Sequence, residues 1–149
     1  MGVNRRNAVA KFFAAALGGA AWSRSANAAE SAGVPKVAYH LADTEKVGFV
    51  VGNIANHIKG MGGPDKVRIV LVVHGPALAL FQTQKTNVAI ERQVAGFAAN
   101  KVGFVACGNT MEAQKIGLAD LLPGFERADE GGVVRLAKLQ AEGYAYLRP

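Results

Sequence analysis

The feature that most constrains the fold is a run of seven residues, Val67 to Val73, that is almost continuously apolar and β-branched. β-Branched side chains favour extended backbone. A strand that lacks polar alternation is typically covered on both faces, as happens inside parallel sheets with helical connections. The run therefore predicts a strand in the interior of a parallel sheet.

The segments on either side of this run alternate between strand and helix patterns. Four further strands are expected, at residues 36–41, 101–107, 125–128 and 144–147. Helices are expected from residue 43 or 44 to Gly60, over residues 77–84, from residue 86 or 87, and over residues 109–117 and 133–142. This order predicts an α/β fold: a single three-layer domain with a mainly parallel five-stranded sheet and helices on both faces.

Residues 1–28 have the pattern of a cleavable export signal. The Arg5-Arg6 pair precedes an apolar stretch at residues 8–21, and residues 26–28 (Ala-Asn-Ala) have the small side chains that a signal peptidase reads. The apolar stretch is shorter than the roughly 20 residues that span a bilayer as a helix, so a signal is favoured over a membrane anchor. The arginine pair resembles a twin-arginine signal, and general secretory export is the alternative.

Cleavage after Ala28 would leave a short linker at residues 29–35 and one domain at residues 36–149. We expect this mature chain to be periplasmic, with no membrane span. Of the net charge of +6, residues 1–28 carry +4, because they hold four basic residues and no acidic one. The rest of the chain has no basic run and little aromatic interleaving, so no nucleic-acid partner is expected.

Three reactive side chains stand at or near the ends of successive predicted strands. His40 lies near the end of the first strand, His74 just after the second, and Cys107 at the end of the third. Because ligands of open parallel sheets bind outside the carboxyl ends of the strands, these residues are expected at one candidate site. Each histidine also has a structural interpretation: His40 as half-buried packing, and His74 as a hydrogen-bond partner of the turn at Gly75-Pro76 instead of a proton-transfer group.

A metal site built from these three residues is not favoured, because no two of them stand at a short ligand spacing. We therefore expect neither a metal nor a cofactor. Cys107 is the only cysteine, so the chain has no internal disulfide. It is either a reactive thiol or a small buried hydrophobe.

The residues after Cys107 favour the reactive interpretation. Gly108, Asn109 and Thr110 begin a predicted helix, with Asn109 as the expected N-cap and Glu112 completing a capping box. Unpaired N–H groups and the helix dipole at this position stabilise negative charge. They would favour the thiolate, which is the form that acts as a nucleophile or sulfur acceptor.

The body of the chain resembles the DsrE/DsrF-like sulfur-relay superfamily. The resemblance lies in KVAYHL with the following helix VGFVVGNIANHI, in VRIVLVVHGPAL, in VGFVACGNTMEAQKIG and in the tail GFERADEGGVVRLAKLQAEGYAYL. It implies a compact α/β domain, assembly into homo-oligomers such as trimers or hexamers, and a protein that donates or accepts sulfur. It also implies that Cys107 accepts sulfur as a persulfide, as the cysteine at this position does in sulfur-carrier members.

These observations lead to a first hypothesis, an exported sulfur carrier or sulfurtransferase-like protein. Cys107 would accept sulfane sulfur and His74 would assist proton transfer. The remaining binding residues would be His40, Gly75, Gly108, Asn109 and Thr110. One alternative is a non-catalytic oligomeric module that binds a small ligand or metal in the strand-end cleft. Another is a structural assembly partner with no small-molecule site.

Overall fold

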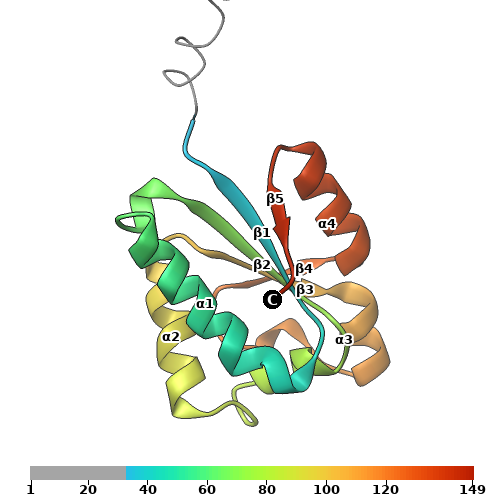
Figure 1. The fold of residues 1–149 in the computed structure, drawn as a ribbon. Helices are drawn as coiled ribbons and strands as arrows, with labels where there is room; N and C mark the ends of the chain where they lie inside the picture. Colours follow the sequence, from blue (N-terminus) through green and yellow to red (C-terminus); the bar gives the residue numbers. More distant parts are fainter. Residues whose placement is uncertain (1–32) are drawn as a thin grey trace, which may run out of the picture. The chain divides into compact units, whose positions relative to one another are not determined.

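The fold is built on a five-stranded sheet in which every pair of neighbouring strands is parallel (Figure 1). The computed structural model describes residues 33–149, so the predicted export signal and residues 29–32 of the predicted linker lie outside the described residues. The strands lie in the spatial order β4-β3-β2-β1-β5. Their bounds are β1 (Lys36–Leu41), β2 (Arg68–Val73), β3 (Gly103–Cys107), β4 (Phe125–Ala128) and β5 (Ala145–Leu147).

Helices cover both faces of the sheet. Helices α1 (Val47–Gly60) and α2 (Val88–Ala99) lie on one face, and α4 (Gly132–Ala141) lies on the other (Figure 1). The short helix α3 (Gly108–Gln114) follows β3 directly. The chain adds β1 to β4 in one direction and then returns to place β5 beside β1. A right-handed return crossover puts α4 on the face opposite α1 and α2.

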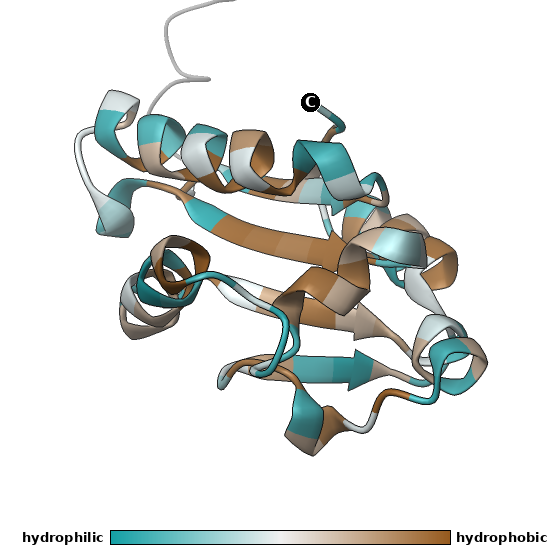
Figure 2. Ribbon diagram, turned by 90° about the horizontal axis from the view of Figure 1, so that it is seen from below, coloured by the Kyte–Doolittle hydropathy of each residue, from teal (hydrophilic) through white to brown (hydrophobic). Residues whose placement is uncertain are grey.

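The hydrophobic run predicted as an interior strand forms β2, which lies at the centre of the sheet. Alternate residues Ile69, Leu71 and Val73 join the core under α1 and α2. Val72 faces the other way, into a smaller core with Leu136 of α4. Residues 69–73 of β2 are therefore covered on both faces of the sheet, which explains why they are all apolar, whereas Arg68 at the start of the strand is exposed (Figure 2).

The predicted α/β architecture is confirmed, and two strands match their predicted bounds, Lys36–Leu41 and Phe125–Ala128. The third strand begins two residues later than predicted, because Lys101 adopts a left-handed turn conformation with φ of 62°. Asn87 caps α2, and its side chain accepts a hydrogen bond of 2.9 Å from the Ile90 N–H.

The short helix predicted at residues 77–84 is instead a 3-10 segment over Gly75–Phe81, which begins directly after His74. None of the helices within residues 33–149 combines the length and the apolar character needed to cross a bilayer.

Candidate functional site

The sheet brings His40, His74 and Cys107 to its carboxyl edge, as the sequence predicts. His40 is two residues after Ala38 in β1, and Cys107 is two residues after Val105 in β3. Ala38 and Val105 belong to the core under α4, and side chains two residues apart in a strand share a face. His40 and Cys107 therefore project towards the α4 face, and His74 lies between them at the end of β2.

His40 and His74 form a hydrogen-bonded pair through their Nε2 atoms. The ring centroids are 4.6 Å apart and the ring planes are nearly parallel, with an interplanar angle of 21°. The other ring nitrogen of His40, Nδ1, lies 2.6 Å from the hydroxyl oxygen of Tyr146 in β5. Strands β5 and β1 and the residue that follows β2 thus contribute to one hydrogen-bonded chain: Tyr146 to His40 to His74.

Burial keeps both histidines neutral near pH 7. It lowers the pKa of His40 to about 4, and the positive charges of His74 and Arg148 act in the same direction while Asp43 opposes them. Burial, followed by the charge of Arg148, also lowers the pKa of His74. Each ring consequently carries a single N–H, and the pair shares its protons through the Nε2 contact.

Cys107 lies between the first turns of two helices, α3 and α4. Burial raises the pKa of its thiol, but this effect is outweighed by hydrogen bonds from the Thr110 side chain and from the backbone N–H groups of Gly132, Thr110 and Asn109. The pKa of Cys107 is therefore lowered from its ordinary value of 9.0. These N–H groups are free for the thiolate because the first amides of a helix have no partner within it.

The Thr110 hydroxyl is held in place by Gly75. The Gly75 N–H donates to Thr110 Oγ1 at 3.0 Å, so the hydroxyl hydrogen remains available for the sulfur of Cys107. The Gly75 carbonyl in turn accepts a 2.9 Å hydrogen bond from Gln114 Nε2. Gly75 has a φ of +58°, a conformation that favours glycine. The two predicted binding residues Gly75 and Thr110 thus position the thiol's hydrogen-bond donor.

A cavity of about 250 Å³ opens beside the thiol. It is lined by His74, Cys107, Asn109, Thr110, Glu130, Gly131, Gly132, Val133 and Val134. A methyl group on Gly132 would lie 3.2 Å from Cys107 Cβ and 3.4 Å from His74 Cβ, so this glycine packs against the base of both side chains. Cys107 is only 6% exposed, so the cavity is its route to small molecules.

Two sequence predictions at this site need correction. Asn109 is not the N-cap of α3: the helix begins at Gly108, and Cys107 occupies the cap position. The capping box with Glu112 is also wrong, because the Glu112 carboxylate forms an exposed ion pair of 2.6 Å with Arg127 of β4. In addition, His40 reaches the site only through His74 and does not line the cavity.

Sequence reasoning missed Gly132 and Tyr146. Gly132 follows β4 at the same carboxyl edge, so the Gly131-Gly132 pair was a usable signal. Tyr146 gave no such signal, because its role depends on β5 pairing with β1. In that register Tyr146 lies beside Ala38, which places its hydroxyl on the His40 face.

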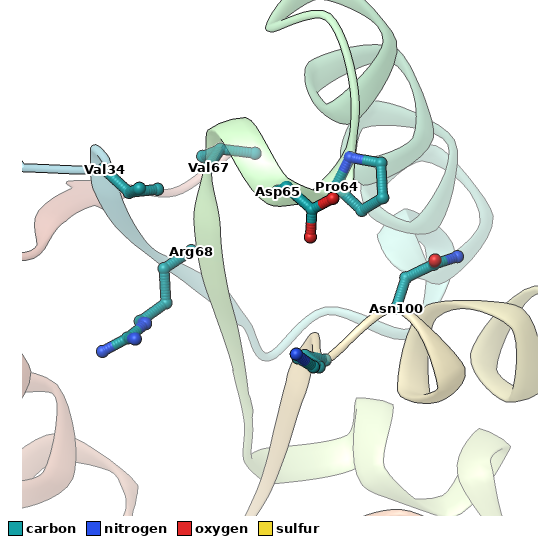
Figure 3. Close-up of a pocket in the computed structure, with 7 residues that line it drawn as sticks. Val34, Pro64, Asp65, Val67, Arg68 and Asn100 are labelled. Carbon is teal, nitrogen blue, oxygen red and sulfur yellow. The ribbon is translucent and has the colours of Figure 1, made fainter.

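Other cavities lie elsewhere on the described residues, and one of them, of about 490 Å³, is lined by Tyr39, His57 and Arg148 among others. Among residues 33–149, no three His, Cys, Asp or Glu side chains lie close enough together to hold a metal ion. Another cavity, of about 190 Å³, lies at the amino ends of β2 and β3 and is lined by Arg68, Asp65 and Asn100 among others (Figure 3). It contains no cysteine or histidine, and it lies at the end of the strands opposite Cys107.

Comparison with known proteins supports the fold. No protein-family model matches the chain, and no curated protein matches it. Among solved structures, it is similar to MTH1491, a protein of unknown function from Methanobacterium thermoautotrophicum, with a TM-score of 0.67 and 26% identity over 77% of this chain and 99% of that one. It is also similar to the ychN protein from E. coli, with a TM-score of 0.57 and 16% identity over 76% of this chain and 99% of that one. The chain has a DsrE-like fold.

The hydroxyl of Thr110 provides a direct test of the thiol environment. We expect Thr110→Val to raise the pKa of Cys107 by about one, because a hydrogen bond to a charged group contributes roughly 1.5–3 kcal/mol and one pKa unit corresponds to about 1.4 kcal/mol. The measurement is the rate of iodoacetamide alkylation as a function of pH. Thr110→Ser retains the hydroxyl and should keep the midpoint of the wild type. A midpoint unchanged by Thr110→Val would contradict this description of the site.

Proposed function

We propose that this DsrE-like protein carries sulfane sulfur as a persulfide on Cys107. The observation that carries the proposal is the position of the thiol: Cys107 stands directly before the first turn of α3 and borders a cavity that also reaches His74. Thr110 and the amides of α3 and α4 lower the pKa of this thiol. Thiolate is the nucleophilic form of cysteine, and this environment favours it at lower pH than for an ordinary thiol. A fold alone does not determine function, so the proposal depends on this site.

The transfer needs no oxidant. The Cys107 thiolate attacks the outer sulfur of a persulfide or polysulfide donor, a new S–S bond forms, and the S–S bond of the donor breaks. The donor leaves as a thiolate or a shorter polysulfide and takes a proton from solvent. The thiol proton of Cys107 is lost before the attack, so atoms, electrons and protons balance. The same steps in reverse deliver the sulfur to an acceptor thiolate.

The surroundings of the cavity suit a protein donor or acceptor. Val133 and Val134, at the start of α4, line the cavity and are 68% and 45% exposed. Exposed apolar residues beside a reactive group are typical of surfaces that another protein covers. We therefore propose that sulfur enters and leaves through a protein that contacts this rim. Export to the periplasm and assembly into homo-oligomers, both predicted from the sequence, are further parts of this proposal.

The test is the intact mass of the chain after incubation with sulfide and polysulfide. We expect the wild type to gain the mass of one sulfur atom, and reductant to remove it. Cys107→Ser should gain nothing, because it has no thiol. Thr110→Val, which retains the thiol, should gain sulfur more slowly at neutral pH than Thr110→Ser.

A wild-type chain that stays unmodified, and whose thiol is alkylated only after unfolding, would mean that Cys107 is a buried structural residue. That result would exclude the sulfur-carrier function and favour ligand binding at the histidine edge.

A further inference from the structure

The hydrogen-bonded chain of Tyr146, His40 and His74 joins the thiol cavity to the protein surface. His74 lines the cavity beside Cys107. Its Nε2 is paired with His40 Nε2, and His40 Nδ1 is paired with the Tyr146 hydroxyl at 2.6 Å. Tyr146 is 40% exposed, whereas His40 is 9% exposed. This series of hydrogen bonds thus begins at His74 in a buried cavity and ends at Tyr146, which is in contact with solvent.

This connectivity couples the tautomers of the two histidines. A hydrogen bond between two Nε2 atoms requires that one carries a proton and the other does not, and a neutral ring carries one proton in total. If His74 holds its proton on Nε2, then His40 holds its own on Nδ1 and donates to Tyr146. If His40 holds its proton on Nε2, then His74 holds its own on Nδ1 and the Tyr146 hydroxyl donates to His40. The two rings are therefore always in opposite tautomers.

We propose that Tyr146, His40 and His74 form a proton relay that transfers the thiol proton of Cys107 from the cavity to solvent. The relay rests on the proposed function, because it serves the ionisation of the thiol before sulfur transfer. His74 exchanges the proton with the thiol or with a molecule in the cavity. His40 and Tyr146 act through His74 and are positioning residues.

Each proton shift in the relay has a defined origin and destination. The thiol proton moves to Nδ1 of His74, the Nε2 proton of His74 moves to Nε2 of His40, and the Nδ1 proton of His40 moves to the Tyr146 oxygen. The hydroxyl proton that Tyr146 carried before is released to water. One proton enters, one leaves, and both rings end in the other neutral tautomer.

Burial of the histidines explains why a relay is needed. An isolated histidine base would have to become an imidazolium, and burial lowers the pKa of both rings and so opposes that charge. A concerted shift along the chain avoids the imidazolium altogether. The reverse shift restores the original tautomers of both histidines, and it delivers a proton to the cavity for the thiolate that leaves the sulfur donor.

The kinetic test uses Tyr146→Phe with polysulfide as the sulfur donor. At saturating polysulfide and below the pKa of Cys107, where the relay makes removal of the thiol proton the rate-limiting step, we expect persulfide formation to slow by about tenfold, a part of the roughly 10²–10⁴-fold that positioned acid–base groups contribute. Above that pKa the thiolate is already formed, and the rate should equal that of the wild type. A merely structural role for Tyr146 would slow the reaction at every pH.

Tyr39→Phe is the matched control. The Tyr39 hydroxyl also bonds a histidine Nδ1, that of His57, at 2.9 Å, but this pair is not connected to the cavity. We expect Tyr39→Phe to leave the pH profile of persulfide formation unchanged. Equal slowing by both variants, or no slowing by Tyr146→Phe, would overturn the relay.

A second measurement does not depend on sulfur transfer. Imidazole ¹⁵N spectra of histidine-labelled protein distinguish Nδ1–H from Nε2–H. We expect opposite tautomers on His40 and His74 in the wild type, and a shifted tautomer balance at His74 in Tyr146→Phe. The same tautomer on both rings would overturn the relay. A wild type with opposite tautomers that takes up no sulfur would instead refute the proposed function.

Discussion

Gly108→Ala is expected to cost about 2–3 kcal/mol of unfolding free energy, the upper part of the range for overpacked sites. A methyl group at this position would lie 2.7 Å from the carbonyl oxygen of Ala128 and 3.3 Å from Asp129 Cα. Both atoms belong to the backbone at the end of β4, so no side chain can rotate away. Either β4 or the start of α3 must move, and Cys107 would move with it. Urea unfolding measures the change through the transition midpoint.

Gly96→Ala is the matched control for this prediction. Gly96 is an exposed residue inside α2, and a methyl group there meets no atom within 4 Å. The same chemical change should therefore stabilise the protein by about 0.5–1 kcal/mol, because alanine favours the helix. A Gly108→Ala protein as stable as the wild type would mean that α3 and β4 do not pack as described.

Acid is expected to destabilise the protein between pH 6.5 and about 4, through the histidine pair. The pKa of His40 is about 4 in the folded state, against an ordinary value of 6.5, and that of His74 is also lowered. Below pH 6.5, therefore, His40 and His74 bind protons in the unfolded chain but remain largely unprotonated in the folded chain. The free energy of unfolding should fall by up to about 1.4 kcal/mol per pH unit for each histidine, and this loss is absent above pH 6.5.

The double variant His40→Gln, His74→Gln isolates this effect. Glutamine does not titrate, so the stability of the variant should change less with pH over the same window. Subtracting its profile from that of the wild type removes the contribution of carboxylates such as Asp43, which faces the pair together with Arg148. Chemical unfolding at half-unit pH steps provides both profiles. Parallel profiles would show that burial does not hold the histidines neutral.

The sequence predicted the sheet well because its signals are local. The apolar run of β2 indicates that both faces of this strand are covered. The alternation of strands and helices predicts that neighbouring strands are parallel. The same order placed His40, His74 and Cys107 at one edge, where the structure brings them together. Strand polarity alone is sufficient for that inference.

Contacts between distant segments could not be predicted in the same way. The amide of Gly132 reaches Cys107 only because α4 starts directly over the end of β3, and Tyr146 reaches His40 only because β5 pairs with β1. The capping box failed for a related reason. The spacing of Asn109 and Glu112 is locally plausible, but tertiary pairing assigns Glu112 to Arg127 and makes Cys107 the cap.

The pairing of β5 with β1 also determines when the site is completed during synthesis. The His40–Tyr146 hydrogen bond joins residues 106 positions apart, and β5 follows β1 to β4 in the chain. A nascent chain can assemble β1 to β4 and expose its cysteine before that final strand is available. Contacts of such long sequence separation form late and slowly. The thiol and both histidines are therefore in place before the Tyr146 hydroxyl reaches His40, so the connection of the histidine pair to the surface is the last part of the site to form.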